Sequence, residues 1–198
     1  MNLAFDADQM PTRICFDKPL SDDALMRFSA ENEWLRVERD ANGELIVMSP
    51  AGTDGGSTEL EVGAELIFWA RKDGRGKAFG ANSGFTLPDS SVRAADAAWL
   101  SFARWNALTR DQQQGYAPIC PEFVIEVRSK SDRLKTLQAK IEMWIANGAE
   151  VAWLIDPQRK VVEIYRPGDS AEELHDPSSV QGTGPVAGFE LVMARVWG

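Results

Sequence analysis

A carboxylate interrupts an apolar segment of the chain at Glu126. The segment Phe123 to Val127 has the sequence Phe-Val-Ile-Glu-Val, which is rich in β-branched and aromatic residues and has the length of a core strand. A carboxylate buried there without a partner would be strongly destabilising, so Glu126 requires a cation. Two sources fit: the guanidinium of Arg128, two residues on and so on the same strand face, or a divalent metal ion shared with a second acid.

Asp96 is the candidate for the second acid. It opens another short apolar segment, Asp96 to Ser101, thirty residues before Glu126 (126 − 96 = 30). Acidic oxygens at the ends of adjacent strands suit Mg²⁺ or Mn²⁺, and such a metal ion polarises a phosphoryl group and lowers the pKa of a bound water. The pair therefore predicts a metal site for phosphate chemistry. Simpler alternatives are a turn cap for Asp96 and a salt-bridged strand residue for Glu126.

A helix predicted from Ser131 to Asn147 supplies a lysine. Ser131 or Asp132 is the expected N-cap and Gly148 the terminator. Lys140 falls at the edge of the apolar stripe of this helix, where its stem can follow apolar surface and its ammonium can return to the sheet. A lysine there can orient water or offset charge in a transition state, although a solvated helix lysine is the simpler alternative.

The chain resembles the Uma-type restriction endonuclease family, a branch of the PD-(D/E)XK nuclease superfamily. The resemblance rests on an ordered series of segments: 42–50, 83–88, the Asp96 segment, 124–132, 148–157 and 162–167. It departs from the superfamily pattern at Ala95, which replaces a proline, and at Arg128, which occupies the position of the usual lysine. Arginine is too basic and too planar to be a simple replacement. The resemblance implies that the lysine has moved to the following helix, as Lys140.

The resemblance also adds accessory residues and a fold. Glu61 resembles the first-helix acid that assists metal or water in the superfamily, although a capping box with Thr58 explains Glu61 equally well. The backbone carbonyl of Val127 is a further expected metal ligand. Gln138, on the other flank of the helix stripe, is an accessory candidate beside Arg128. The implied fold is α/β, with a restriction-endonuclease-like central mixed sheet flanked by helices.

Composition limits the classes of protein that fit. The 198 residues suffice for one domain spanning 1–198, with no membrane span or secretory signal, so we expect a cytoplasmic protein. Cys15 and Cys120 are too few for a disulfide framework or a zinc site and are expected to be buried thiols. The single histidine, His175, lies in a polar acidic segment, which argues against triad hydrolases and zinc deaminases. No organic cofactor is predicted, and we expect a homodimer.

Net charge argues against a general nucleic-acid binder, but its distribution favours DNA contact at two places. The net charge is −9, from 30 acidic and 21 basic residues. The turn at 71–77 has four bases and one acid, and the segment 128–140 has five bases and one acid. We expect phosphate-backbone contacts, strongly dependent on salt, from these bases. The predicted DNA-binding residues are Arg71, Lys72, Arg75, Lys77, Lys130 and Arg133.

The remaining segments predict the order of elements around the site. We expect a loose arm at 1–20, a helix at 22–32, a hairpin turning at Asn42-Gly43 and a helix at 58–71. Short strands are expected near 77–79, 84–87 and 96–101, followed by a helix at 104–114. A βαβ crossover then joins the Glu126 strand to a strand at 150–155, with a hairpin partner at 160–165. The segment 168–188 is expected to be mostly loop, before a last strand at 189–193.

Three functions are compatible with these residues. The preferred hypothesis is a Mg²⁺- or Mn²⁺-dependent endonuclease that cleaves DNA with Asp96, Glu126 and Lys140. The rival is a nuclease-fold domain that no longer cuts and acts as a dimeric binding module. Retention of the two acids and the lysine favours the first, because an inactive domain has no need of all three. Hydrolysis of another phosphate ester differs only in its substrate.

Overall fold

The computed structural model describes residues 11–48 and 52–197, which fall into two compact units. Within these limits unit 1 comprises residues 11–48, 84–94 and 108–119, and unit 2 comprises residues 52–83, 95–107 and 120–197. Every predicted catalytic, metal-binding and DNA-binding residue belongs to unit 2.

Unit 1 is built on a small antiparallel sheet with the strand order β1-β3-β2-β6-β5. Its elements are β1 (Thr12–Ile14), α1 (Asp22–Glu31), β2 (Arg36–Arg39), β3 (Leu45–Met48), β5 (Phe85–Thr86), β6 (Val92–Arg93) and α4 (Arg110–Gln114). The predicted hairpin is present: Arg39 pairs with Leu45, and Gly43 in the connection has a φ of 86°, which glycine adopts readily. Leu25 and Phe28 of α1 pack with Leu45 in the core of this unit.

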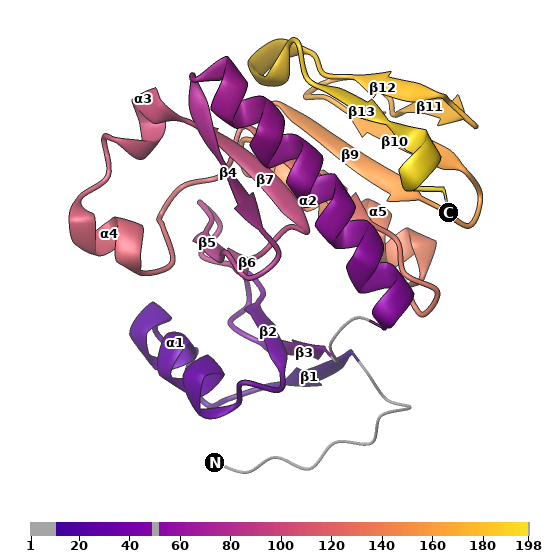
Figure 1. Cartoon of the computed structure of the whole chain (residues 1–198). Helices are drawn as coiled ribbons and strands as arrows, with labels where there is room; N and C mark the ends of the chain where they lie inside the picture. Colours follow the sequence, from indigo (N-terminus) through magenta and orange to yellow (C-terminus); the bar gives the residue numbers. More distant parts are fainter. Residues whose placement is uncertain (1–10, 49–51, 198) are drawn as a thin grey trace. The chain divides into compact units, whose positions relative to one another are not determined.

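Unit 2 contains a six-stranded mixed sheet with the order β11-β10-β9-β8-β7-β4 (Figure 1). Its strands are β4 (Gly76–Gly80), β7 (Ala97–Ser101), β8 (Phe123–Val127), β9 (Val151–Asp156), β10 (Val161–Tyr165) and β11 (Glu172–His175). Only the β8–β9 pair is parallel among these described strands, as the predicted crossover requires. This sheet confirms the expected mixed sheet flanked by helices.

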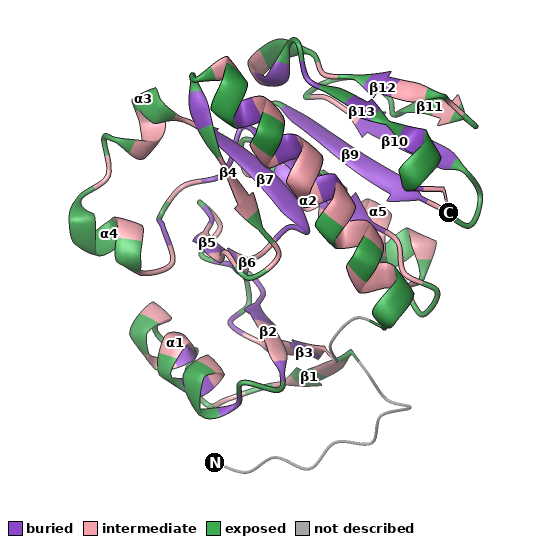
Figure 2. Ribbon diagram, viewed as in Figure 1, coloured by how far each residue is buried: buried purple, intermediate pink, exposed green. Residues whose placement is uncertain are grey.

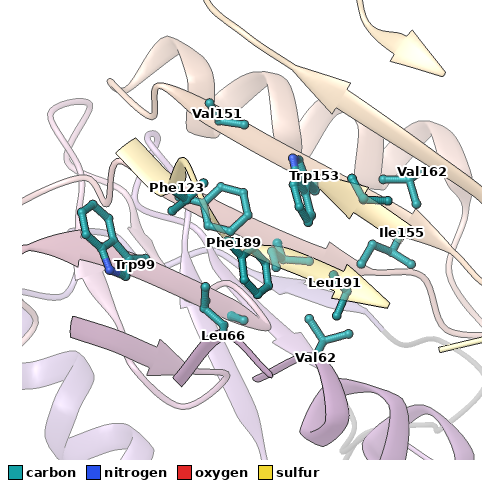
Figure 3. Packing of buried hydrophobic residues seen from close by; sticks show 14 of the residues in the cluster. Val62, Leu66, Trp99, Phe123, Val151, Trp153, Ile155, Val162, Phe189 and Leu191 are labelled. Carbon is teal, nitrogen blue, oxygen red and sulfur yellow. The ribbon is translucent and has the colours of Figure 1, made fainter. Parts of the chain in front are cut away.

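The long helix α2 (Thr53–Asp73) covers one face of this sheet. Val62 and Leu66 of α2 pack against strand residues such as Ile155, together with Phe189 and Leu191 from the C-terminal segment (Figure 3). That segment adds β12 (Ser179–Gln181), η2 (Gly184–Val186), β13 (Glu190–Val192) and η3 (Met193–Arg195). The central strands are buried along their length (Figure 2), so a polar group within them must find a partner inside the protein.

The helix α5 (Leu134–Ala146) connects β8 to β9 and covers the other face of the sheet. Successive side chains of a strand point to opposite faces. Ile125 and Val127 belong to the cluster beneath α2, whereas Glu126 between them contacts side chains of α5. The strand alternation therefore directs Glu126 towards α5.

Two segments predicted to be irregular contain strands. In the expected arm at 1–20, β1 pairs with β3, so that prediction is wrong for Thr12–Ile14, while residues 1–10 lie outside the described part. In the expected loop at 168–188, β11 pairs with β10 and β12 pairs with β13. The strands β11 and β12 are short, half-exposed and largely polar, which conceals the apolar alternation from which strands are predicted.

Three predicted helix boundaries differ in the structure. Helix α2 begins at Thr53, and the Thr58 hydroxyl donates to the Asp54 carbonyl, so the capping box with Glu61 is wrong. The single helix expected at 104–114 is two short ones, α3 (Phe102–Trp105) and α4. Helix α5 begins at Leu134, after Arg133 as N-cap, because the Asp132 carboxylate accepts the Ser129 N–H in the preceding turn.

The cysteines and the histidine take no part in the predicted site. Cys120 is buried as expected, but Cys15 is exposed, which contradicts the expectation of two buried thiols. The Cys15 thiol lies 3.0 Å from a carboxylate oxygen of Glu44, and that contact raises its pKa because the carboxylate disfavours the thiolate. His175 is exposed on β11. No helix in the described ranges has the length and apolar character needed to cross a membrane.

A close backbone approach at Gly76 generates the first prediction. A Cβ atom on Gly76 would collide with the Trp99 ring and the Leu100 carbonyl, whereas a Cβ on Gly80, in the same strand, meets nothing within 4 Å. Gly76→Ala should lower the free energy of unfolding by about 1–3 kcal/mol, the usual cost of overpacking. Gly80→Ala is the matched control and should change it by less than about 1 kcal/mol. Urea denaturation measures both; equal midpoints would contradict the packing at Gly76.

Candidate metal-dependent nuclease site

The Glu126 carboxylate is buried at the end of β8 and receives two donors from α5. Glu126 is 2% exposed. The Lys140 ammonium lies 2.9 Å from its Oε1 and 3.1 Å from its Oε2, and the Trp144 indole N–H donates to Oε1 at 2.8 Å. Lys140 and Trp144 are four residues apart and so lie on the same face of α5. The cation required by Glu126 is therefore Lys140, from the helix rather than from its own strand.

Asp96 lies beside Glu126 because of the register between β7 and β8. Ala97 pairs with Ile125, so continuing this antiparallel pairing by one residue brings Asp96 opposite Glu126. The Asp96 carboxylate accepts the Val127 backbone N–H at 2.8 Å, and Asp96 is 8% exposed. The structure thus brings Asp96, Glu126 and Lys140 together, from β7, β8 and α5.

This donor set fits a hard divalent cation. The two carboxylates are largely buried and come from neighbouring strands, and the Val127 backbone joins them through its bond to Asp96. Within residues 11–48 and 52–197, no cluster of three or more His, Cys, Asp or Glu side chains could hold a metal ion. Mg²⁺ needs no such cluster, because it retains several waters and is commonly held by one or two carboxylates. A zinc site would require a fuller set of protein ligands.

Arg128 has its own carboxylate partner at the end of β9. Its Nη1 donates to Oδ2 of Asp156 at 2.8 Å, and Nε and Nη2 both donate to the Asp132 carbonyl at 3.2 Å. Asp156 is only 1% exposed, and its Oδ1 accepts the backbone N–H groups of Gln158 and Arg159. The arginine in the position of the superfamily lysine therefore fastens the turn after β8 to the end of β9.

Gln138 and Glu61, the accessory candidates, are engaged elsewhere. The Gln138 amide donates to both oxygens of Glu163, at 3.2 and 3.0 Å, and the Tyr165 hydroxyl donates to Glu163 at 2.6 Å. Burial, followed by this hydrogen bond, raises the pKa of Tyr165. On the other side of the sheet, Glu61 of α2 accepts from Arg195 at 2.9 Å. The structure places neither side chain on the Glu126 carboxylate.

The two basic segments lie at different distances from the carboxylates. Lys130 and Arg133 are exposed in the turn that follows β8, next to Glu126 in the chain. The turn at 71–77 leads into β4, and Gly76 pairs with Ser101 whereas Gly80 pairs with Ala97. Asp96 precedes Ala97, so the 71–77 turn lies at the opposite end of β7 from Asp96. Lys77 stacks over Phe79 and Trp105, and Arg75 pairs with Asp73.

Trp144 and Asp156 are the two residues of this arrangement that sequence reasoning missed. Trp144 lies within the predicted helix 131–147 and is fully buried, and its indole N–H donates to Glu126. Its position four residues after Lys140 was the available signal. Asp156 directly follows the strand predicted at 150–155. The distance in sequence between Arg128 and Asp156 conceals their pairing, which follows from the parallel register of β8 and β9.

The family model described as "Putative restriction endonuclease", Uma2, matches residues 22–194. The chain belongs to the Uma2 family. A solved structure described as a "putative nuclease belonging to DUF820 from Anabaena variabilis ATCC 29413" has a TM-score of 0.72 with this chain at 19% identity, over 90% of this chain and 98% of the other. At that identity the likeness shows the fold alone. No curated protein matches. These findings confirm the expected family and the nuclease-like fold.

The ion pair of this Uma2 protein generates the second prediction. Removal of one partner of a buried pair leaves an uncompensated charge, which typically costs about 3–5 kcal/mol. Lys140→Met should therefore lower the free energy of unfolding strongly, and adding Glu126→Gln should recover a large part of the loss. The measurement is a double-mutant cycle by urea denaturation with no divalent metal ion present.

The matched control for this cycle is an exposed ion pair of the same unit. Lys130 and Asp54 lie 3.5 Å apart, with side chains 83% and 88% exposed. Their coupling should be below about 1 kcal/mol, as for other exposed pairs. A coupling between Lys140 and Glu126 as small as that of the control would show that the buried pair does not stabilise the fold.

Proposed function

We propose that this protein is a Mg²⁺- or Mn²⁺-dependent endonuclease that hydrolyses phosphodiester bonds of DNA. The observation that carries the proposal is the convergence of two buried carboxylates and a lysine at one end of the β7–β8 pair. Membership of the Uma2 family adds support, since the family model carries the description "Putative restriction endonuclease". This arrangement also favours a cutting enzyme over an inactive binding module, because the acids and the lysine are held together rather than dispersed.

Each residue has a role set by its position. Asp96 and Glu126 would hold the metal ion, with the Val127 carbonyl as a proposed assistant. The bound ion would polarise the phosphoryl group and lower the pKa of a water, the chemistry that such ions supply in phosphodiester hydrolysis. Lys140 would orient the attacking water and stabilise negative charge that develops on the phosphoryl oxygens. Glu61 has no role in this proposal, because it accepts from Arg195 on the other side of the sheet.

The DNA would be held by its phosphates. Lys130 and Arg133, in the turn that follows Glu126, are placed to contact the phosphates nearest the scissile bond. Arg71, Lys72, Arg75 and Lys77 lie at the far end of β7, and a five-residue strand spans only about 15 Å. That distance is short relative to the length of a DNA duplex, so the basic segment at 71–77 can contact phosphates further along the same duplex. Because these contacts pair basic side chains with phosphates and release counterions, we expect binding to weaken steeply with salt.

The third prediction tests the metal and the lysine together. Millimolar Mn²⁺ should raise the melting temperature of the wild type and leave that of Glu126→Gln unchanged, because a ligand stabilises the state that binds it. Lys140→Met should lower the rate of DNA cleavage by about 100-fold or more, the scale of one lost transition-state contact. Plasmid cleavage and thermal unfolding with and without Mn²⁺ measure these effects.

Arg128→Lys provides the matched control for the lysine. Arg128 is bound to Asp156, and a lysine in its place keeps the positive charge. The rate of DNA cleavage by Arg128→Lys should therefore stay within about tenfold of the wild-type rate. Inactivity of Arg128 variants together with wild-type activity of Lys140→Met would assign the chemistry to Arg128. A wild type that binds Mn²⁺ but cuts no supercoiled, linear or single-stranded DNA would favour the binding-module function.

The fourth prediction separates the two basic segments. Binding of duplex DNA should be followed with Ca²⁺ in place of Mg²⁺, as a function of salt concentration. If each removed base contacts one phosphate, Lys130→Ala with Arg133→Ala should reduce the slope of log K against log salt by about 2. Arg71→Ala with Lys72→Ala should reduce it less. A slope unchanged by the first pair would mean that DNA does not follow the turn after β8.

A further inference from the structure

Trp144 contacts the predicted metal-binding carboxylate but has no role in the proposed chemistry. Its indole N–H donates to Oε1 of Glu126 at 2.8 Å, a short bond from a neutral donor. Trp144 is 0% exposed and Glu126 is 2% exposed. A hydrogen bond between two fully buried groups is not exchanged with water, so it fixes the carboxylate more firmly than a contact at the surface.

The two carboxylate oxygens have different donors. Oε1 accepts from the Trp144 indole N–H at 2.8 Å, whereas the Lys140 ammonium donates to Oε2 at 3.1 Å and also lies 2.9 Å from Oε1. The two donors also differ in freedom. Lys140 has a long flexible stem and a side chain that is 17% exposed, while the indole of Trp144 is enclosed by the core and has two side-chain torsions. Trp144 is therefore the fixed donor and Lys140 the adjustable one.

We propose that Trp144 is a positioning residue that holds Oε1 of Glu126 towards α5 and so presents Oε2, together with Asp96, to the divalent metal ion. This inference rests on the proposed metal-dependent function. Carboxylates that bind metal ions are commonly oriented by hydrogen bonds from outside the ligand set, and removal of such a bond weakens metal binding. Because the indole holds the carboxylate, Lys140 can turn to the substrate without releasing Glu126 from its orientation.

Trp99 provides a matched control within the same unit. Like Trp144 it is buried, but its indole nitrogen has no hydrogen-bond partner in the described part of the chain. Trp99 lies in β7 beneath α2 and contacts none of the proposed metal ligands through its indole N–H. Trp99→Phe and Trp144→Phe remove the same atoms from the core, and only the second removes a hydrogen bond to Glu126.

The first test is binding of Mn²⁺ alone, measured by calorimetry on wild type and the two variants. Trp144→Phe should bind Mn²⁺ on the order of tenfold more weakly than wild type, whereas Trp99→Phe should stay within about twofold. With saturating Mn²⁺, Trp144→Phe should also show a lower kcat for DNA cleavage with the KM for DNA unchanged. A general loss of packing would affect both variants alike.

The second test leaves both tryptophans in place. In a ¹H–¹⁵N spectrum of the protein without metal, the Trp144 indole proton should resonate downfield of the Trp99 indole proton, and Glu126→Gln should move the Trp144 resonance alone. A Trp144 resonance that does not move would overturn the inference. If the wild type binds Mn²⁺, equal Mn²⁺ affinities of Trp144→Phe and Trp99→Phe would overturn it as well. A wild type that binds no Mn²⁺ would instead contradict the proposed function itself, and this inference with it.

Discussion

The buried carboxylate of Glu126 is the constraint around which unit 2 is arranged. Burial of a charge in the middle of a sheet face is strongly unfavourable unless the same face supplies a cation and further donors. Helix α5 supplies both, through Lys140 and Trp144 on one side of one helix. The position of α5 along β8 is thereby restricted, since a shift of even one turn would separate both donors from the carboxylate.

The crossover that carries α5 depends on a second buried charge pair. Arg128 and Asp156 join the ends of β8 and β9, the two strands that α5 connects. The guanidinium also donates to the Asp132 carbonyl in the turn before α5. The departure from the superfamily pattern at Arg128 thus has a structural explanation. The arginine stabilises the geometry of the crossover, and the crossover brings Lys140 of α5 to the Glu126 carboxylate.

A third buried carboxylate lies on the same sheet face and follows the same rule. Glu163 pairs across β10 and β9 with Leu154, which in turn pairs with Glu126. Gln138 and Tyr165 supply its donors, as Lys140 and Trp144 do for Glu126. Glu163 has two neutral donors and an ion pair with Arg159 at 3.6 Å, whereas Glu126 has an ammonium at 2.9 Å. Glu126 also differs in lying opposite a second carboxylate, Asp96, when the pairing of β7 and β8 is continued by one residue.

The sequence by itself determined the elements with a strong local signal and the types of residue in the site. Each of three local patterns predicts one element from neighbouring residues: the apolar run at Phe123–Val127, the Asn-Gly turn of the hairpin and the apolar stripe of α5. An acidic residue inside an apolar strand also predicts that a partner for its charge is present. The tertiary structure alone decided which partner each charge takes. Arg128 pairs with Asp156, Gln138 donates to Glu163, and Glu61 accepts from Arg195. These pairings depend on strand register and helix position, which the sequence does not show. Long-range geometry of this kind produces no periodic pattern in the sequence. The polar strands β11 and β12 have no such pattern either, because they form by pairing with a neighbouring strand.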